Sequence, residues 1–225
     1  MTEYGFPSAE QYLELARETV DFVCSQQELR SENNCFCSEI SNSLISLRNP
    51  KADGFTLKAN LETIINDKIH DVQIGGLVQF AADELKCQSY WIELFGRYGS
   101  PLSNKIIYRV HFDVAIPSQE KNAEKHPIYH VQLGGKAAKA EYFDKEMKHW
   151  SSPRIPYIPL SLAMFFEIVF REFGTGYIAE RMYKEKDKGW CAILKKNEEV
   201  MIPALKGKLI EYKHLTVSTV YYDGL

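Results

Sequence analysis

The chain has 225 residues, of which 45% are hydrophobic and 12% aromatic, and its formal net charge is −3. This length and apolar content allow a sizeable core, either in one large domain or in two small ones. The near balance of charge argues against wholesale electrostatic capture of nucleic acid. Nine basic and five acidic residues within 181–213 still permit a local basic face.

The chain shows no signal for export or for membrane insertion. Its first residues, MTEYGFPSAEQ, lack a basic region followed by an apolar core, so no signal peptide is predicted. The densest apolar stretch, residues 155–170, falls short of the roughly 20 apolar residues that a membrane span needs. The five cysteines are an odd number. We therefore predict a cytoplasmic protein with reduced thiols and no membrane association.

The N-terminal part of the sequence predicts helices. Pro7-Ser8 followed by Gln11 resembles a capping box and predicts a helix from residue 9 to about residue 29. A short helix over 38–48 would turn three residues inward: Ile40, Leu44 and Leu47. Residues 49–54 carry a strong turn signal. Residues 55–69 then read as a further helix because apolar residues recur at helical spacing, namely Leu57, Leu61, Ile64 and Ile65.

The middle of the chain predicts antiparallel strands. Gly75-Gly76 is expected to interrupt the pattern, and the stretch after it suits a helix or a strand equally. SYWIELF, residues 89–95, has the aromatic and β-branched bias of a strand. Two more strands, 106–116 and 128–133, follow on either side of a long charged loop. We predict a meander of three or four strands over about 77–134.

These last two strands alternate in character. One face of 106–116 is wholly apolar, and the other carries Arg109, His111 and Asp113. In 128–133, His130 and Gln132 point away from the apolar side. Antiparallel pairing with the apolar faces aligned would gather all five polar groups, with cross-strand neighbours roughly 5 Å apart. We predict that His130 lies within contact range of at least one of three groups: His111, Asp113 and Arg154.

The apolar stretch near residue 160 predicts a buried helix. Prolines keep 153–159 extended, and the helix should run from residue 160 or 161 to Phe173, ending at Gly174. It is apolar nearly all round, so we expect it to pack against the apolar face of strand 106–116. A more polar helix over 177–186 and a helix or helix pair over 190–213, interrupted at Pro203 and Gly207, follow. TVSTVYY, residues 216–222, suits a strand.

Together these elements predict one α+β domain over residues 1–225, with an antiparallel β meander packed by helices and an N-terminal helical portion. Residues 1–70 would be mainly helical, 77–135 would form the sheet, and 153–213 would be helical. Cys35-x-Cys37 lacks the second ligand pair of a structural zinc site. Gly134-Gly135-Lys136 lacks the other residues of a phosphate-binding loop. We therefore predict no metal and no cofactor.

One segment carries a more specific pattern. It reads His-Pro-x-x-His-x-Gln-x-Gly-Gly from His126 to Gly135, and Pro-Arg-x-Pro follows at 153–156 before Ser161 and the apolar helix. The pattern resembles a group of bacterial proteins classed as domains of unknown function, in which a strand ending in Asp precedes such a segment. The resemblance covers about residues 85–175. It implies a small cytoplasmic factor of the kind attached to toxin–antitoxin or phage-defence loci, but it supplies no reaction and no catalytic residues.

The polar groups allow three chemical interpretations. In the first, His111 or His130 is a general base tuned by Asp113, and an arginine stabilises a phosphate-like charge, as in a metal-independent nuclease acting on RNA or DNA. In the second, Asp113, His126 and His130 ligate a divalent metal, although no HExxH or comparable spacing supports this. In the third, the same groups form a hydrogen-bonded network that only stabilises the fold.

The sequence leaves open whether the chain is an enzyme. For a nuclease, the candidate catalytic residues are His111, Asp113, His130 and Arg154. The candidate substrate-binding residues are Arg109, His126 and Gln132. The alternative is a non-enzymatic component of a multi-protein complex, since thirteen tyrosines and three tryptophans could furnish an aromatic interface. The expected partner is thus nucleic acid or another protein.

Overall fold

Six strands form one antiparallel sheet whose order follows the chain, β1-β2-β3-β4-β5-β6. A computed structural model of the chain describes residues 6–25, 34–49, 51–97, 99–100, 104–114, 129–134, 155–174 and 189–212. The strands are β1 (Gly54–Ile65), β2 (Lys68–Ala81), β3 (Glu84–Arg97), β4 (Ile106–Val114), β5 (Tyr129–Leu133) and β6 (Ile155–Pro156). The helices are α1 (Ala9–Ser25), α3 (Asn34–Ser43), α4 (Leu162–Phe173) and α6 (Trp190–Tyr212), with a 3₁₀ turn η1 (Ile45–Arg48).

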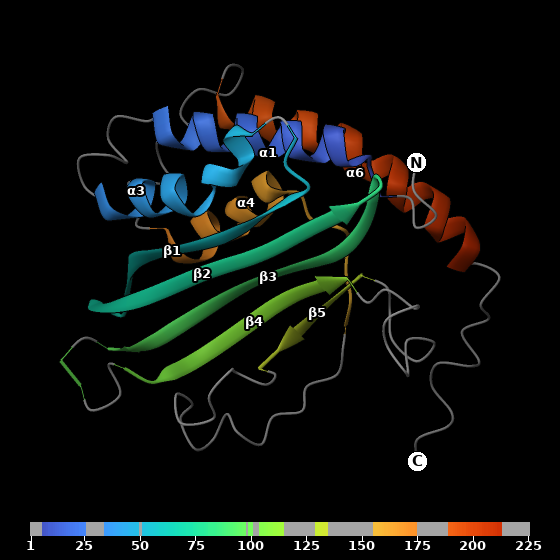
Figure 1. Ribbon diagram of the computed structural model, residues 1–225. Helices are drawn as coiled ribbons and strands as arrows, with labels where there is room; N and C mark the ends of the chain where they lie inside the picture. Colours follow the sequence, from blue (N-terminus) through green and yellow to red (C-terminus); the bar gives the residue numbers. More distant parts are fainter. Residues whose placement is uncertain are drawn as a thin grey trace, which may run out of the picture.

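The four labelled helices all lie on one side of the sheet (Figure 1). We call this side the inner face and the opposite side the outer face. The inner face is apolar because every second residue of each strand points to it. It carries, among others, Phe55, Leu57, Ala59, Leu61, Val72, Ile74, Val78, Tyr90, Ile92, Val110 and Phe112, all buried. The predicted α+β class with an antiparallel meander and an N-terminal helix is confirmed.

The predicted helix over 55–69 is wrong, because these residues belong to β1, the start of β2 and the turn between them. β1 and β2 form a hairpin instead, and burial along β1 alternates with period two from Phe55 to Thr63. The turn between the strands consists of Asn66 and Asp67, with φ angles of 51° and 58°. Two consecutive positive φ angles mark the tight turn whose twist matches antiparallel strands. The sheet therefore begins at Gly54 and not at residue 77.

Gly75 and Gly76 do not interrupt the sheet but lie inside β2. A Cβ on Gly75 would approach the indole of Trp91 to 2.1 Å, and one on Gly76 would approach the ring of Tyr90 to 2.5 Å. Each glycine therefore makes room for an aromatic ring from β3, one on each face of the sheet.

The first two helical predictions are confirmed. The hydroxyl of Ser8 accepts a hydrogen bond from the backbone N–H of Gln11 at 3.3 Å, so it caps α1 as expected. The described part of the helix is Ala9–Ser25, and the predicted end near residue 29 lies outside the described residues. Its buried residues include Tyr12, Leu15, Ala16, Thr19 and Val23. In α3 and η1 the inward residues are Ile40, Leu44 and Leu47, as predicted.

Helix α4 packs on the sheet as predicted. The hydroxyl of Ser161 caps it by accepting from the backbone N–H of Met164 at 3.2 Å. Phe165 stacks on Tyr90 of β3 with ring centroids 4.6 Å apart, and it meets Phe112 of β4 edge-on at 6.3 Å. These contacts fix α4 over β3 and β4, whose outer sides carry the candidate site.

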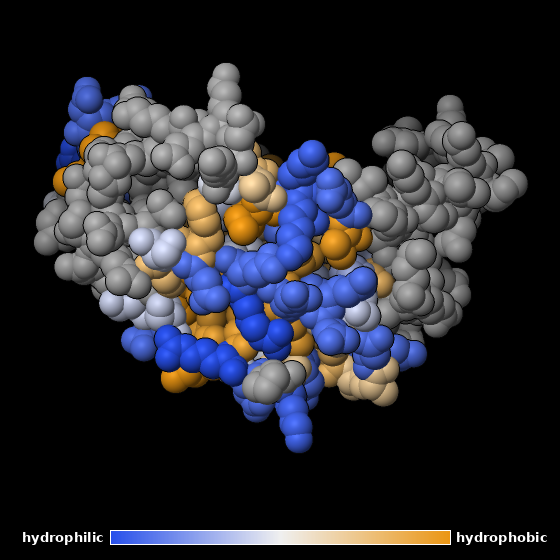
Figure 2. All heavy atoms as spheres, turned by 90° about the horizontal axis from the view of Figure 1, so that it is seen from above, coloured by the Kyte–Doolittle hydropathy of each residue, from blue (hydrophilic) through white to orange (hydrophobic). Residues whose placement is uncertain are grey.

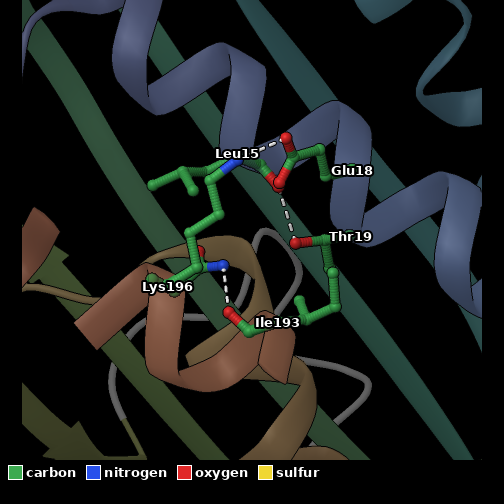
Figure 3. A network of polar contacts seen from close by, with 6 residues as sticks. Leu15, Glu18, Thr19, Ile193 and Lys196 are labelled. Atoms are coloured by element: carbon green, nitrogen blue, oxygen red, sulfur yellow. Dashed lines mark hydrogen bonds and ion pairs between the residues drawn. The ribbon is translucent and has the colours of Figure 1, made fainter. Parts of the chain in front are cut away.

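Helix α6 runs from Trp190 to Tyr212 without a break, so the predicted interruption at Pro203 and Gly207 is wrong. A proline removes one backbone donor, and the rest of a helix can continue past it. The start of α6 is held by the Trp190 indole, which donates to Glu167 of α4 at 2.5 Å. Figure 3 shows Lys196 of α6 reaching Glu18 of α1, an ion pair of 2.5 Å. The helical side of the molecule presents mainly polar side chains outward (Figure 2).

Several predictions lie outside the described residues: the loop 118–125, the helix 177–186, the strand 216–222 and the extended segment at 153–154. The backbone of Cys35 and Cys37 belongs to α3, and their side chains are not described. Within the described part of the chain, no helix is both long and apolar enough to cross a membrane.

Candidate functional site on the outer face of the sheet

The strand register places the polar side chains of the outer face in rows that cross the sheet. One row contains Lys58, Gly75, Trp91, His111 and Gln132, from β1 to β5 in that order. We call it the histidine row. The next row contains Thr56, Leu77, Ser89, Asp113 and His130. Four of the seven residues proposed from the sequence therefore lie in two adjacent rows, over β4 and β5.

Asp113 is the centre of this cluster. One carboxylate oxygen lies 2.5 Å from Nδ1 of His111, two residues earlier on the same strand. The other oxygen accepts a hydrogen bond of 2.5 Å from the hydroxyl of Ser89 on β3. His130 on β5 is the direct cross-strand partner of Asp113. The predicted antiparallel pairing of the two strands is confirmed, and of the three groups predicted to lie near His130 the register places Asp113 directly opposite it.

The surroundings of Asp113 favour its ionised form. Burial by itself would raise the pKa of the carboxyl group. The hydrogen bond and charge of His111, the hydrogen bond from Ser89 and the charge of His130 outweigh burial, so the pKa of Asp113 lies below its ordinary value. Asp113 is therefore an anion at neutral pH. A carboxylate that orients a histidine has to be ionised in this way.

His111 is oriented by this anion. Its Nδ1 faces the carboxylate, so in the neutral ring Nδ1 carries the proton and Nε2 holds the free lone pair. Nε2 is buried and has no hydrogen-bond partner among the described residues. The side chain as a whole is 16% exposed. An aspartate on Nδ1 and an unpartnered Nε2 is the arrangement that makes histidine a general base.

The arginine on β4 is already paired. Nε of Arg109 lies 3.2 Å from a carboxylate oxygen of Glu93 on β3, and both side chains are largely buried. Burial raises the pKa of Glu93, while the charges of Arg109 and Lys58 oppose this rise. Arg109 therefore contributes a partly neutralised charge next to the histidine row, and not an isolated phosphate-binding cation.

Trp91 and Ser89 were not identified from the sequence. Trp91 is the cross-strand partner of His111, and its indole covers Gly75 on the neighbouring strand. Ser89 is the cross-strand partner of Asp113. The β-branched and aromatic character of 89–95 predicts the strand, but the register between β3 and β4 depends on the whole sheet.

Two of the other predicted residues lie on β5, and two fall outside the described residues. His130 is only 4% exposed, less than the side chain of His111. Gln132 is half-buried in the histidine row, opposite His111. Arg154 and His126 lie outside the described residues. No group of three or more side chains suited to hold a metal ion occurs in the described parts of the chain.

A separate cavity of about 320 Å³ lies between α1, α3 and η1. Its polar lining is partly satisfied already, since Arg17 donates to the carbonyl of Leu47 at 2.6 Å and Cys24 contacts the hydroxyl of Ser41 at 3.2 Å. It contains no histidine. The cavity therefore offers no imidazole base among its lining residues.

Comparisons with protein-family models, curated proteins and solved structures found no significant match.

Proposed function

We propose that this chain is a metal-independent phosphodiesterase that acts on nucleic acid, with His111 as general base and Asp113 as its positioning residue. The observation that supports this most directly is the contact between Asp113 and Nδ1 of His111, which leaves Nε2 without a partner among the described residues. A histidine held this way can accept a proton at Nε2 and return it.

A single imidazole, that of His111, accepts the proton of the nucleophile and returns a proton to the leaving oxygen. Nε2 of His111 is buried in the unbound protein, so substrate binding has to expose it. Nε2 then takes the proton of the attacking hydroxyl or water as the new oxygen–phosphorus bond forms. The imidazolium, stabilised by Asp113, then returns a proton to the leaving oxygen as the old bond breaks. The side chain of His130 lies across from Asp113 and adds positive charge beside it when protonated. The roles of Arg154 and His126 in phosphate binding stay part of the proposal.

The biological setting depends on a different argument. Only the resemblance of residues 85–175 to bacterial domains of unknown function supports a role in toxin–antitoxin or phage-defence systems. A nuclease is the activity that such a setting would use, so the two parts of the proposal agree.

The test is cleavage of labelled RNA and DNA in the presence of EDTA. We expect the unmodified protein to cut at least one of them and His111→Ala to cut it about 10²- to 10⁴-fold more slowly, the usual contribution of a positioned general base. Lys86→Ala is the control, because Lys86 pairs with Glu84 on the surface of β3. Equal activity of His111→Ala and the unmodified protein, with both folded, would refute the assignment.

A partner-binding role is the second candidate, and one observation favours it. Ile155, Tyr157 and Ile158 are 50%, 39% and 37% exposed, and they are close together in sequence at the edge strand β6. Exposed apolar side chains at a sheet edge are typical of protein-interaction surfaces. Ile155→Asp should abolish a specific complex and leave nuclease activity intact if this role is separate from catalysis.

A further inference from the structure

We infer that the substrate is single-stranded RNA, with one base stacked on Trp91 and the ribose 2′-hydroxyl as the nucleophile that His111 activates. The cleavage part of this inference rests on the proposed function, whereas the binding part does not. Its basis is the composition of the histidine row, which combines a cation, an aromatic ring, a general base and an amide across neighbouring strands.

The position of Trp91 is specific. A Cβ at Gly75 would lie 2.1 Å from two indole carbons and 2.6 Å from Nε1, so the ring lies directly over this glycine. No other residue at position 75 would leave that space free. The indole therefore extends from β3 across to β2 on the outer face, and the side chain is partly exposed. An aromatic ring laid over a strand is the platform on which single-stranded nucleic acids stack their bases.

The neighbours of Trp91 suit the rest of a nucleotide. On one side, Lys58 is exposed on β1 and can contact a phosphate. On the other side, His111 and Gln132 follow on β4 and β5. A glutamine amide can donate to and accept from a base edge. A base on Trp91 would therefore place the adjoining ribose and phosphate beside His111, and binding has to expose the buried Nε2 for the reaction.

The nucleophile has to come from the substrate or from water, because the described side chains at the site offer none. The hydroxyl of Ser89 donates to Asp113 and not to His111. Burial, with a smaller effect of Asp113, raises the pKa of the Cys87 thiol and keeps it protonated. A ribose 2′-hydroxyl lies next to the bond that breaks, which gives it the advantage of proximity over water.

Every bond and proton of the cleavage step is accounted for. The 2′-oxygen forms a bond to phosphorus while its proton passes to Nε2 of His111. The bond between phosphorus and the 5′-oxygen breaks, and that oxygen takes a proton from the imidazolium. The products are a 2′,3′-cyclic phosphate and a 5′-hydroxyl end. Bases in a duplex are already stacked on each other and cannot reach Trp91, so the strand must be single.

The experiment measures binding and cleavage separately, in EDTA. Binding of fluorescein-labelled oligonucleotides to the His111→Ala variant, which is expected to cleave them only slowly, is followed by fluorescence anisotropy. We expect single-stranded RNA to bind to the His111→Ala variant. Adding Trp91→Leu to this variant should weaken the RNA affinity roughly 5- to 150-fold, the loss typical of one base stack. Trp91→Phe should retain much of the affinity and serves if the leucine variant fails to fold. Tyr108→Leu is the control, an exposed aromatic outside the row.

Cleavage is measured with the unmodified protein on RNA, on 2′-O-methyl RNA and on DNA of the same sequence. We expect only RNA to be cut, with cyclic phosphate ends identified by mass spectrometry. Equal cutting of RNA and DNA would show that water is the nucleophile, which overturns this inference and leaves the proposed function standing. RNA binding that depends on Trp91 without any cleavage would instead overturn the proposed function. Binding unaffected by both Trp91 variants would overturn the stacking surface.

Discussion

Asp113→Asn is expected to lower the stability of the protein by about 1–3 kcal/mol at neutral pH. Asp113 accepts from Ser89 through one oxygen and faces Nδ1 of His111 through the other. An asparagine can accept from Nδ1–H of His111 and donate to the Ser89 hydroxyl, which can also accept, so both contacts can persist but lose the negative charge that strengthens them. For a chain of this size, the midpoint of thermal unfolding should fall by about 2–4 °C per kcal/mol.

The loss should depend on pH in a defined direction. The pKa of Asp113 in the folded protein lies below its ordinary value, so the carboxylate stabilises the fold above the unfolded pKa of about 3.9. This stabilisation disappears as the pH falls through the lower, folded pKa. Denaturant titrations at pH 7, 5 and 3 should therefore show a difference between the two proteins that is full at pH 7 and smaller at pH 3.

Two results would contradict this reasoning. A difference that is equal at pH 7 and pH 3 would mean that the charge of Asp113 does not stabilise the fold. Full nuclease activity in Asp113→Asn would mean that the carboxylate does not orient His111. Glu84→Gln is the matched control, because it makes the same chemical change at an exposed position, 63% exposed, on the same sheet. It should change stability by less than about 0.5 kcal/mol.

Three further predictions concern the core, the sheet and metals. Phe166→Ala and Phe170→Ala should each lower the free energy of unfolding by about 3–5 kcal/mol in a denaturant titration, because both rings are fully buried in α4; unchanged midpoints would show that α4 is not a core element. Gly75→Ala should displace the Trp91 ring and reduce RNA affinity together with stability, since its Cβ would overlap the indole; a folded variant with normal binding would contradict the role of the ring. A chelator should leave the circular dichroism spectrum unchanged, and elemental analysis should find no stoichiometric zinc; unfolding by the chelator would reveal a structural metal.

Local patterns were sufficient to predict the hairpin and the central helix. The alternation in 106–116 and 128–133 predicts which side chains share a face, because period two is a property of any strand. It places His111, Asp113, His130 and Gln132 together without knowledge of the register. The nearly all-apolar surface of 162–173 likewise predicts a buried helix. These features depend only on residues close together in the chain.

The helix predicted over 55–69 shows where local patterns fail. Leu57, Leu61, Ile64 and Ile65 fit a helical spacing, but Leu57 and Leu61 also fit the alternation of a strand. The pairing of β1 with β2 decides between them, through twelve residue pairs and a turn at Asn66 and Asp67. Short apolar runs fit both periods, so their tertiary partners determine the outcome.

The sequence by itself thus determined the α+β class, the buried helix and the polar face of β4 and β5. Only the tertiary structure decided that Ser89 and Trp91 join this face, that Arg109 is paired with Glu93, and that His130 is buried. The physical reason is register: a shift of one residue between β3 and β4 would move every side chain of β3 to the opposite face relative to its partners. That register is set by the packing of the whole sheet against α4, which no short stretch of the chain contains.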